Sequence, residues 1–163
     1  MSTFISVGNA KQAYPRFLSL IEQVVDLLSA PVLLQVGHNT YSHAHLECVD
    51  FLSMPEFQQR IQQSDLLILH GGAGSIITAL RYGRIPIVIP RRAGIGEHID
   101  DHQVEFVTEL SKSGRILVAE DIQTLRRAIT DYPDKFGQQV INNHPPLLEH
   151  LRHAIQELME NNG

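Results

Sequence analysis

Two continuous apolar runs, Asp65–Leu69 and Ile85–Ile89, most constrain what this chain can fold into. Strands that are apolar at nearly every position bury both of their faces, as strands do in the middle of a parallel sheet. A stretch with helical spacing, from about Ser75 to Tyr82, lies between the two runs, and Gly83 ends it. This strand–helix–strand order is the unit from which parallel sheets are built.

The same alternation continues along most of the chain. Apolar spacing and turn residues predict strands at Thr3–Val7, Val32–Val36, Glu47–Phe51 and Arg115–Val118, and helices at Tyr14–Leu28, after a capping box at Ser53 and Glu56, from about His98 to Lys112, and after Asp121. We therefore predict an α/β fold with a single Rossmann-like, doubly wound, mostly parallel sheet. One connection fits poorly, because residues 37–46 are too few for an ordinary crossover helix.

The size of the chain suits one domain over residues 1–163. A polar connection over residues 131–146 leads to a final amphipathic helix at 147–160. The net charge of −5 argues against a nucleic-acid partner. With one cysteine, no signal peptide and no apolar stretch long enough to span a bilayer, the sequence predicts a cytoplasmic protein. Any attachment to a membrane is then expected to come from a partner or a surface helix.

The segment "LHGGAGS", residues 69–75, is the strongest candidate for a binding site. A strand runs into a glycine-rich turn and then into a helix, so free backbone amides and the helix dipole face an incoming anion. The natural ligand is a diphosphate. The residues involved are His70, Gly71, Gly72, Ala73, Gly74 and Ser75. The alternative for the glycine turn is a tight strand-to-helix connection that binds no ligand. The alternative for His70 is a plain core histidine.

The segment "GIGEHIDDHQVEF", residues 94–106, crowds polar side chains at the predicted start of a helix. Carboxylates and amides there are suited to sugar hydroxyls, and the candidates are Glu97, His98, Asp101, His102 and Gln103. A capped and solvated helix start is the alternative. The spacing of His98 and His102 also permits a metal site, but the pattern lacks the glutamate of zinc proteases, and we predict no metal.

Other nucleotide-binding patterns fit less well. Neither a dinucleotide fingerprint nor a P-loop is present, because Ile77 stands where a third glycine is needed and no lysine follows the turn. Arg91 and Arg92 follow the next strand, where they could read a 2′-phosphate, so an NADP-binding domain stays open. Gly8 and Asn9 follow the first strand and are a weaker candidate.

Taken together, "HGGAGSIITALRYGRIPIVIPR" and "GEHIDDHQVEF" resemble the C-terminal domain of family 28 glycosyltransferases. The similarity is closest to the small donor-binding subunits of split bacterial exopolysaccharide glycosyltransferases. It extends to the cytosolic subunit of the dolichol-linked N-acetylglucosaminyltransferase. The resemblance covers roughly residues 3–130.

The resemblance implies the C-terminal half of a GT-B enzyme, inverting transfer and no metal or other cofactor. It implies a UDP-sugar donor over Gly71–Ser75, with Asp101, His102 and Gln103 facing the sugar and phosphates, and Gly8 and Asn9 lining the cleft. It also implies a membrane-anchored partner subunit that brings a lipid-linked acceptor, and hence a peripheral place at the inner membrane face.

Two departures and one gap qualify this expectation. Thr78 stands where many relatives carry an acid for the ribose, and Asn9-Ala10 replaces a Thr-His pair. No residue of the chain is a convincing general base, so the catalytic residue is unassigned and expected on the partner. A non-catalytic nucleotide-sugar-binding subunit, half of a nucleotide-sugar epimerase and the NADP-binding domain are the alternatives.

Overall fold

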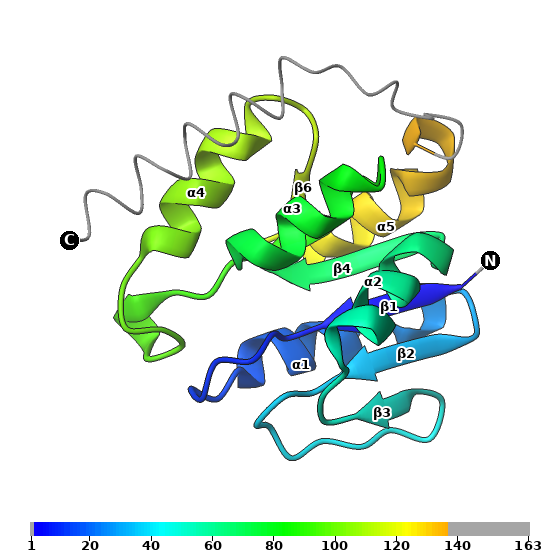
Figure 1. Ribbon diagram of the computed structural model, residues 1–163, viewed down its shortest axis with the longest axis horizontal. Helices are drawn as coiled ribbons and strands as arrows, with labels where there is room; N and C mark the ends of the chain where they lie inside the picture. The colour runs from blue at the N-terminus through cyan, green and yellow to red at the C-terminus, as the bar shows by residue number, and fades with distance from the viewer. Residues whose placement is uncertain (1, 137–163) are drawn as a thin grey trace.

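The computed structural model describes residues 2–136 as one six-stranded sheet between two layers of helices (Figure 1). The strands are β1 Thr3–Ser6, β2 Val32–Gln35, β3 Glu47–Val49, β4 Leu66–His70, β5 Ile87–Ile89 and β6 Leu117–Val118. Their order is β3-β2-β1-β4-β5-β6, and every neighbouring pair is parallel. This is the order of a Rossmann sheet, which confirms the predicted fold class.

The helices lie on both faces of the sheet. They are α1 Pro15–Glu22, α2 Met54–Gln63, α3 Ala73–Arg81, α4 His102–Ser111 and α5 Ile122–Phe136, with short 3-10 turns η1 Val25–Leu27 and η2 Ala93–Ile95. One face packs against α1 and α5, and the other against α2, α3 and α4. Within residues 2–136 no helix is both long and apolar enough to cross a membrane.

Alternating side chains on each strand explain the continuous apolar runs. Phe4 and Leu67 pack toward α2 and α3, whereas Ile5 and Ile68 pack toward α1 and α5. All four are fully buried, which explains why both faces of the middle of these strands are apolar.

The ends of several elements also follow the predicted local chemistry. The hydroxyl of Ser53 accepts a hydrogen bond from the amide of Glu56, whose carboxylate accepts one from the amide of Ser53, which confirms the capping box before α2.

Strands β2 and β3 are parallel neighbours and residues 37–46 contain no helix, as the shortness of this connection predicted. Three predicted helix boundaries were wrong. The predicted helix Tyr14–Leu28 is divided, because α1 ends at Glu22 and the turn η1 covers Val25–Leu27. Helix α4 begins at His102 rather than near His98, because contacts described below hold residues 96–101 in turns. Helix α5 continues to Phe136 beyond the predicted start of the connection, and the buried hydroxyl of Tyr132 donates to the carbonyl of Ile85. The predicted helix at 147–160 lies outside the described residues.

We expect Ile68→Ala to destabilise the fold by about 2–5 kcal/mol, because it leaves a cavity in the middle of the central strand. Urea denaturation measures this change in the free energy of unfolding. Ile99→Ala is the control, since that side chain is 80% exposed and its removal should change stability by less than about 0.5 kcal/mol. Equal losses in both variants would contradict the assigned core.

Candidate functional site

The carboxyl ends of β1 and β4 meet at the point where the strand order reverses, and His70 and Gly8 lie there. His70, the last residue of β4, retains only 8% of its exposure. Gly8 has a φ of +79°, and a Cβ added to it would lie 2.5 Å from the His70 ring. A Cβ at Gly72 would collide with the same ring. The imidazole therefore fills the space between two glycines, which explains why both positions lack a side chain.

Helix α3 begins directly behind this ring and leaves its first amides uncapped. Its N-cap is Gly72, which has no side chain to accept a hydrogen bond, and its first turn contains no acidic residue. A Cβ at Gly74 would meet nothing within 4 Å, so the approach to this turn is open. The hydroxyl of Thr78 donates 2.7 Å to the carbonyl of Gly74. Free amides and the helix dipole at an open, glycine-lined turn favour an anion.

The second predicted segment lies against the first. The Oε1 atom of Gln103 accepts a hydrogen bond from the amide of Arg91 at 3.2 Å, and a Cβ at Gly71 would lie 3.1 Å from this same side chain. Asp101 accepts from the amide of Ala93 at 2.8 Å. Thus the fold brings the glycine turn and residues 101–103, which are about thirty positions apart in the sequence, to one place.

Asn9 belongs to a chain of polar contacts across the ends of β1 and β2. The hydroxyl of Ser6 donates to Oε1 of Gln35 at 2.9 Å, and Nε2 of Gln35 donates to Oδ1 of Asn9 at 3.1 Å. This chain fixes the Asn9 amide with its oxygen inward, so its NH₂ group is the part left for a ligand at this exposed position.

Glu97 does not face the open site, contrary to the sequence-based expectation. It is 3% exposed, and its two carboxylate oxygens each accept from Arg16 at 2.9 Å. One of them also accepts from the amide of Arg92 at 3.0 Å. Glu97 therefore holds the loop after β5 in place and is not available to sugar hydroxyls.

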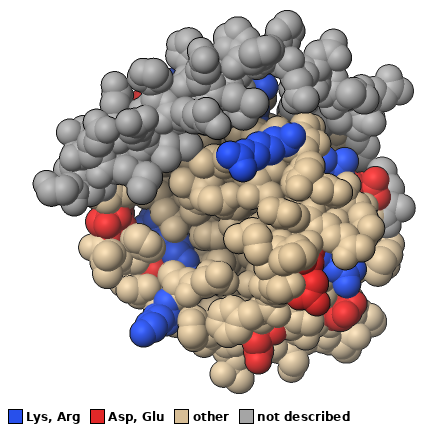
Figure 2. Space-filling view, viewed as in Figure 1, with Lys and Arg blue, Asp and Glu red and all other residues tan. Residues whose placement is uncertain are grey.

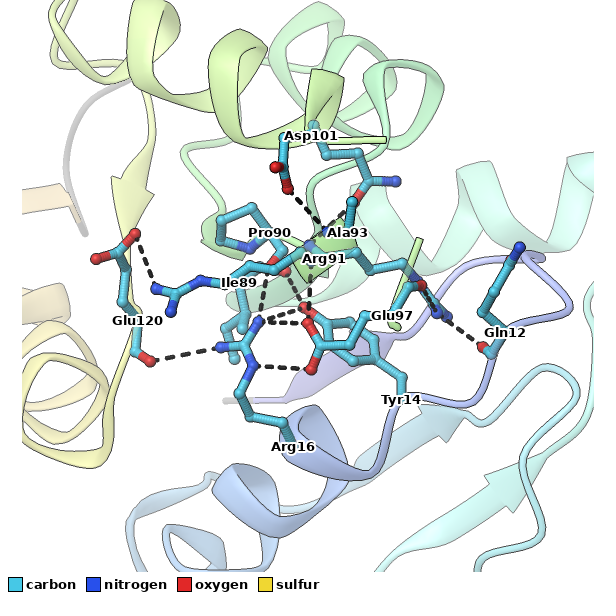
Figure 3. Close-up of polar contacts among 12 residues, drawn as sticks. Gln12, Tyr14, Arg16, Ile89, Pro90, Arg91, Ala93, Glu97, Asp101 and Glu120 are labelled. Atoms are coloured by element: carbon cyan, nitrogen blue, oxygen red, sulfur yellow. Dashed lines mark hydrogen bonds and ion pairs between the residues drawn. The ribbon is translucent and has the colours of Figure 1, made fainter. Parts of the chain in front are cut away.

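Arg91 is also buried, which removes the main support for NADP binding. None of its surface is exposed, and its guanidinium donates to the carbonyls of Val7, Gln12 and Glu97 at 2.8–3.1 Å (Figure 3). It lies 4.3 Å from the centre of the Tyr14 ring. Sequence reasoning missed the Tyr14, Arg16 and Arg91 cluster. The available signal was an arginine placed directly after a buried strand and Pro90.

His98 and His102 are not on the same helix turn, because α4 starts at His102. Both lie near Asp100, at 3.4 and 3.9 Å, and His102 lies 3.5 Å from Glu105. In the part of the chain that the structure describes, no group of three or more His, Cys, Asp or Glu side chains is arranged to hold a metal ion.

Burial and the charge of Arg91 together determine the protonation state of His70 at the centre of the site. Burial, and then the positive charge of Arg91, lower the pKa of His70 from 6.5 to about 4. His70 is therefore neutral at physiological pH. Its Nδ1 atom is enclosed and has no hydrogen-bond partner among the described residues.

Comparison with known families agrees with this geometry. The model of the "Glycosyltransferase family 28 C-terminal domain" matches residues 4–160. The chain belongs to this family. A curated relative, "UDP-N-acetylglucosamine transferase subunit ALG13" of Yarrowia lipolytica, is 27% identical over 125 residues, which are 67% of this chain and 62% of the relative. This family 28 chain thus matches less than two thirds of that relative's length.

Two solved structures share the fold. The solution structure of ALG13 superposes with a TM-score of 0.63 and 18% identity, and the match covers 92% of this chain and 94% of that one. The crystal structure of the kitacinnamycin glycotransferase superposes with a TM-score of 0.58 and 20% identity, over 99% of this chain but 40% of that enzyme. The fold of this family 28 domain therefore corresponds to one part of a larger GT-B glycosyltransferase.

The neutral, buried His70 should make stability depend on pH. Its folded pKa lies below the unfolded value of 6.5, so between pH 6.5 and about 4 the unfolded chain takes up a proton that the folded chain excludes. The free energy of unfolding should therefore fall with pH across this window, by about 2 kcal/mol between pH 7 and 5. His70→Phe should lack this component, and urea denaturation at several pH values measures it. Parallel pH profiles for the two proteins would show that His70 titrates normally.

Proposed function

We propose that this chain is the donor-binding subunit of an inverting glycosyltransferase that transfers a sugar from a UDP-sugar to a lipid-linked acceptor. The single observation that carries the proposal is the uncapped start of α3, which lies at the switch point of the sheet beside Gln103. Ligands of such sheets bind at this point. Family membership supports the transferase, and the name of the Yarrowia relative supports a UDP-N-acetylhexosamine donor and a subunit role.

The diphosphate is best placed over the first turn of α3. The amides of Ala73, Gly74 and Ser75 have no capping side chain, so they are available to phosphate oxygens. His70 lies beneath them as a neutral imidazole, which does not compete for the amides as a carboxylate would. The ribose would lie toward Thr78, whose hydroxyl proton is already donated to Gly74.

The sugar is best placed toward residues 98–103. Gln103 keeps its NH₂ group as a donor, because only its oxygen is used by Arg91. Asp101 accepts from Ala93 through one oxygen, and the other is available to hydroxyl groups. His98 and His102 lie on the same segment and complete a polar wall for the sugar. Gly8 and Asn9 form the opposite side of the cleft.

Inverting transfer needs two kinds of assistance. An acceptor hydroxyl oxygen attacks the anomeric carbon while the bond from that carbon to the diphosphate oxygen breaks, and UDP leaves with the electron pair. The amides of α3 stabilise the charge that develops on the diphosphate. A general base must take the hydroxyl proton. We assign that base to a partner subunit.

A partner would meet this domain at the carboxyl edge of the sheet. Among residues 2–136, four large apolar side chains beyond the ends of β3 and β5 are 48–80% exposed: Phe51, Met54, Ile95 and Ile99. They follow strand ends at the edge of the sheet toward which the strand arrows of Figure 1 point. A membrane-anchored partner that covers this edge would close the cleft, supply the acceptor and keep the complex at the cytoplasmic face of the membrane. The predicted helix at 147–160 is a further candidate for this joint.

Binding of nucleotides should depend on the diphosphate. We expect UDP to bind at least about 100-fold more tightly than uridine, with an affinity unchanged by EDTA. Gly74→Ala should weaken UDP binding about tenfold, because its methyl group enters the open approach without touching the protein. The same change should preserve or raise stability, since alanine is the better helix former. Calorimetry measures the affinities, and Gly94→Ala, which also adds a methyl group in open space, is the control. Equal affinities for uridine and UDP would contradict the placement of the diphosphate over the first turn of α3.

Turnover should require a second subunit. We expect sugar transfer from a UDP-sugar to membrane extract only when this chain is co-expressed with a membrane-anchored partner of similar size. Ile99→Asp should weaken the association, measured by co-purification, because it puts a charge on the apolar edge. Tyr82→Asp, a change at an exposed aromatic residue just after α3, should leave it intact. Acceptor-dependent turnover by the purified single chain would contradict the split enzyme, and UDP-sugar binding without turnover in any complex would favour a non-catalytic subunit.

A further inference from the structure

We propose that Arg91 is a positioning residue that joins the two loops on either side of the ligand site and holds them at a fixed separation. These loops are residues 7–12, after β1, and residues 90–103, after β5. The consequence for UDP binding rests on the proposed function, but the joint itself does not.

The guanidinium of Arg91 makes contacts on both sides of the site. Its Nη1 atom donates to the carbonyl of Gln12 at 2.8 Å and to that of Glu97 at 2.9 Å. Its Nη2 atom donates to the carbonyl of Val7 at 3.1 Å. Val7 and Gln12 mark the two ends of the first loop, whereas Glu97 lies in the middle of the second. A single rigid, planar group therefore links both loops through their backbones, which a flexible ammonium group does less well.

The start of α1 reinforces this joint from below, as Figure 3 shows. The hydroxyl of Tyr14 donates to the carbonyl of Ile89 at 2.7 Å, and its ring packs against Arg91. Arg16 donates to the carbonyl of Pro90 at 2.7 Å and holds Glu97 through both carboxylate oxygens. Each of these bonds connects the α1 region with the end of β5 or the segment that follows it.

The charges of the joint are unequal, which argues that it does more than fill space. Glu97 neutralises Arg16, whereas the hydrogen bonds of Arg91 within residues 2–136 all go to backbone carbonyls. Its Nε atom is buried without a partner there. The Tyr14 ring and the nearby charge of Glu97 stabilise the cation, but an apolar side chain would pack a purely structural joint without burying a charge. The positive charge reaches the site, because it contributes to the lowered pKa of His70.

Two buried tyrosines provide a matched test of the joint. Tyr14 donates to the carbonyl of Ile89, at the end of β5 beside the site, and Tyr132 donates to the carbonyl of Ile85, before the start of β5. Tyr14→Phe and Tyr132→Phe each remove one buried hydroxyl that donates to a carbonyl, and Tyr14→Phe also removes the acceptor of a long, 3.4 Å bond from Arg16. Both changes should destabilise the fold by about 0.5–1.5 kcal/mol. Their effects on the loops should differ.

Hydrogen exchange of the free protein is the deciding measurement. We expect Tyr14→Phe to accelerate exchange about tenfold in residues 8–12 and in residues 93–101 together, and Tyr132→Phe to leave both loops unchanged. Arg91→Lys, which keeps the charge but not the planar fork, should loosen the same two loops. The inferred joint would be contradicted if Tyr14→Phe or Arg91→Lys loosened only one loop. It would also be contradicted if Tyr132→Phe loosened both loops.

UDP titration then separates this inference from the proposed function. We expect Tyr14→Phe to weaken UDP about tenfold and Tyr132→Phe to leave its affinity unchanged. If the wild-type protein did not bind UDP, the proposed function would be contradicted. The hydrogen-exchange result would still show whether Arg91 joins the two loops. If UDP bound equally to both variants despite looser loops, the positioning role would be overturned.

Discussion

The divergence of β1 and β4 is the constraint on which the rest of the site depends. The two strands are parallel neighbours, but the chain leaves β1 toward the face covered by α1 and leaves β4 toward the face covered by α3. Their loops therefore separate at the same edge and open a crevice that no side chain is required to make. The space-filling view looks onto the side of the molecule that carries α2 and α3, and a hollow with Lys or Arg atoms beside it is visible there (Figure 2).

Two interactions then adapt the crevice to an anion. The His70 ring fills the space between Gly8 and Gly72 and adds no charge there. Helix α3 begins behind this ring with free amides, because its N-cap is a glycine. Arg91 is withdrawn into the protein, where it contacts the loops after β1 and β5, and the half-exposed Arg92 pairs with Glu120. The proposed anion site would therefore use backbone dipoles more than side-chain charges.

The sequence predicted the fold class because apolar runs and helical spacing report burial directly. It also predicted that the glycine turn and Gln103 belong together, and the contact between Gly71 and Gln103 agrees with this. The role of Glu97 was misread, because a carboxylate near a helix start has the same local pattern whether it faces solvent or a distant arginine. Its partner, Arg16, is 81 positions away in the sequence, and no local sequence pattern indicates such a pair.

The same limit applies to element ends and to the buried cluster. Helix α5 continues past the predicted connection, and Tyr132 within it bonds to Ile85 across 47 positions. Arg91 resembled a surface reader of phosphate, because sequence proximity to a strand end does not reveal that Tyr14 covers its guanidinium. Long-range contacts of single polar side chains decide these cases, and only the fold brings them together.

The lateral edges of the sheet have a consequence of their own. The edge strands β3 and β6 are only three and two residues long, so each presents few unpaired backbone groups to another chain. Edges this short offer few backbone groups for pairing with an added strand, and strand addition is the usual route to sheet extension and aggregation. Among the described residues, the sides of the sheet therefore offer little backbone for extension by a strand of another molecule.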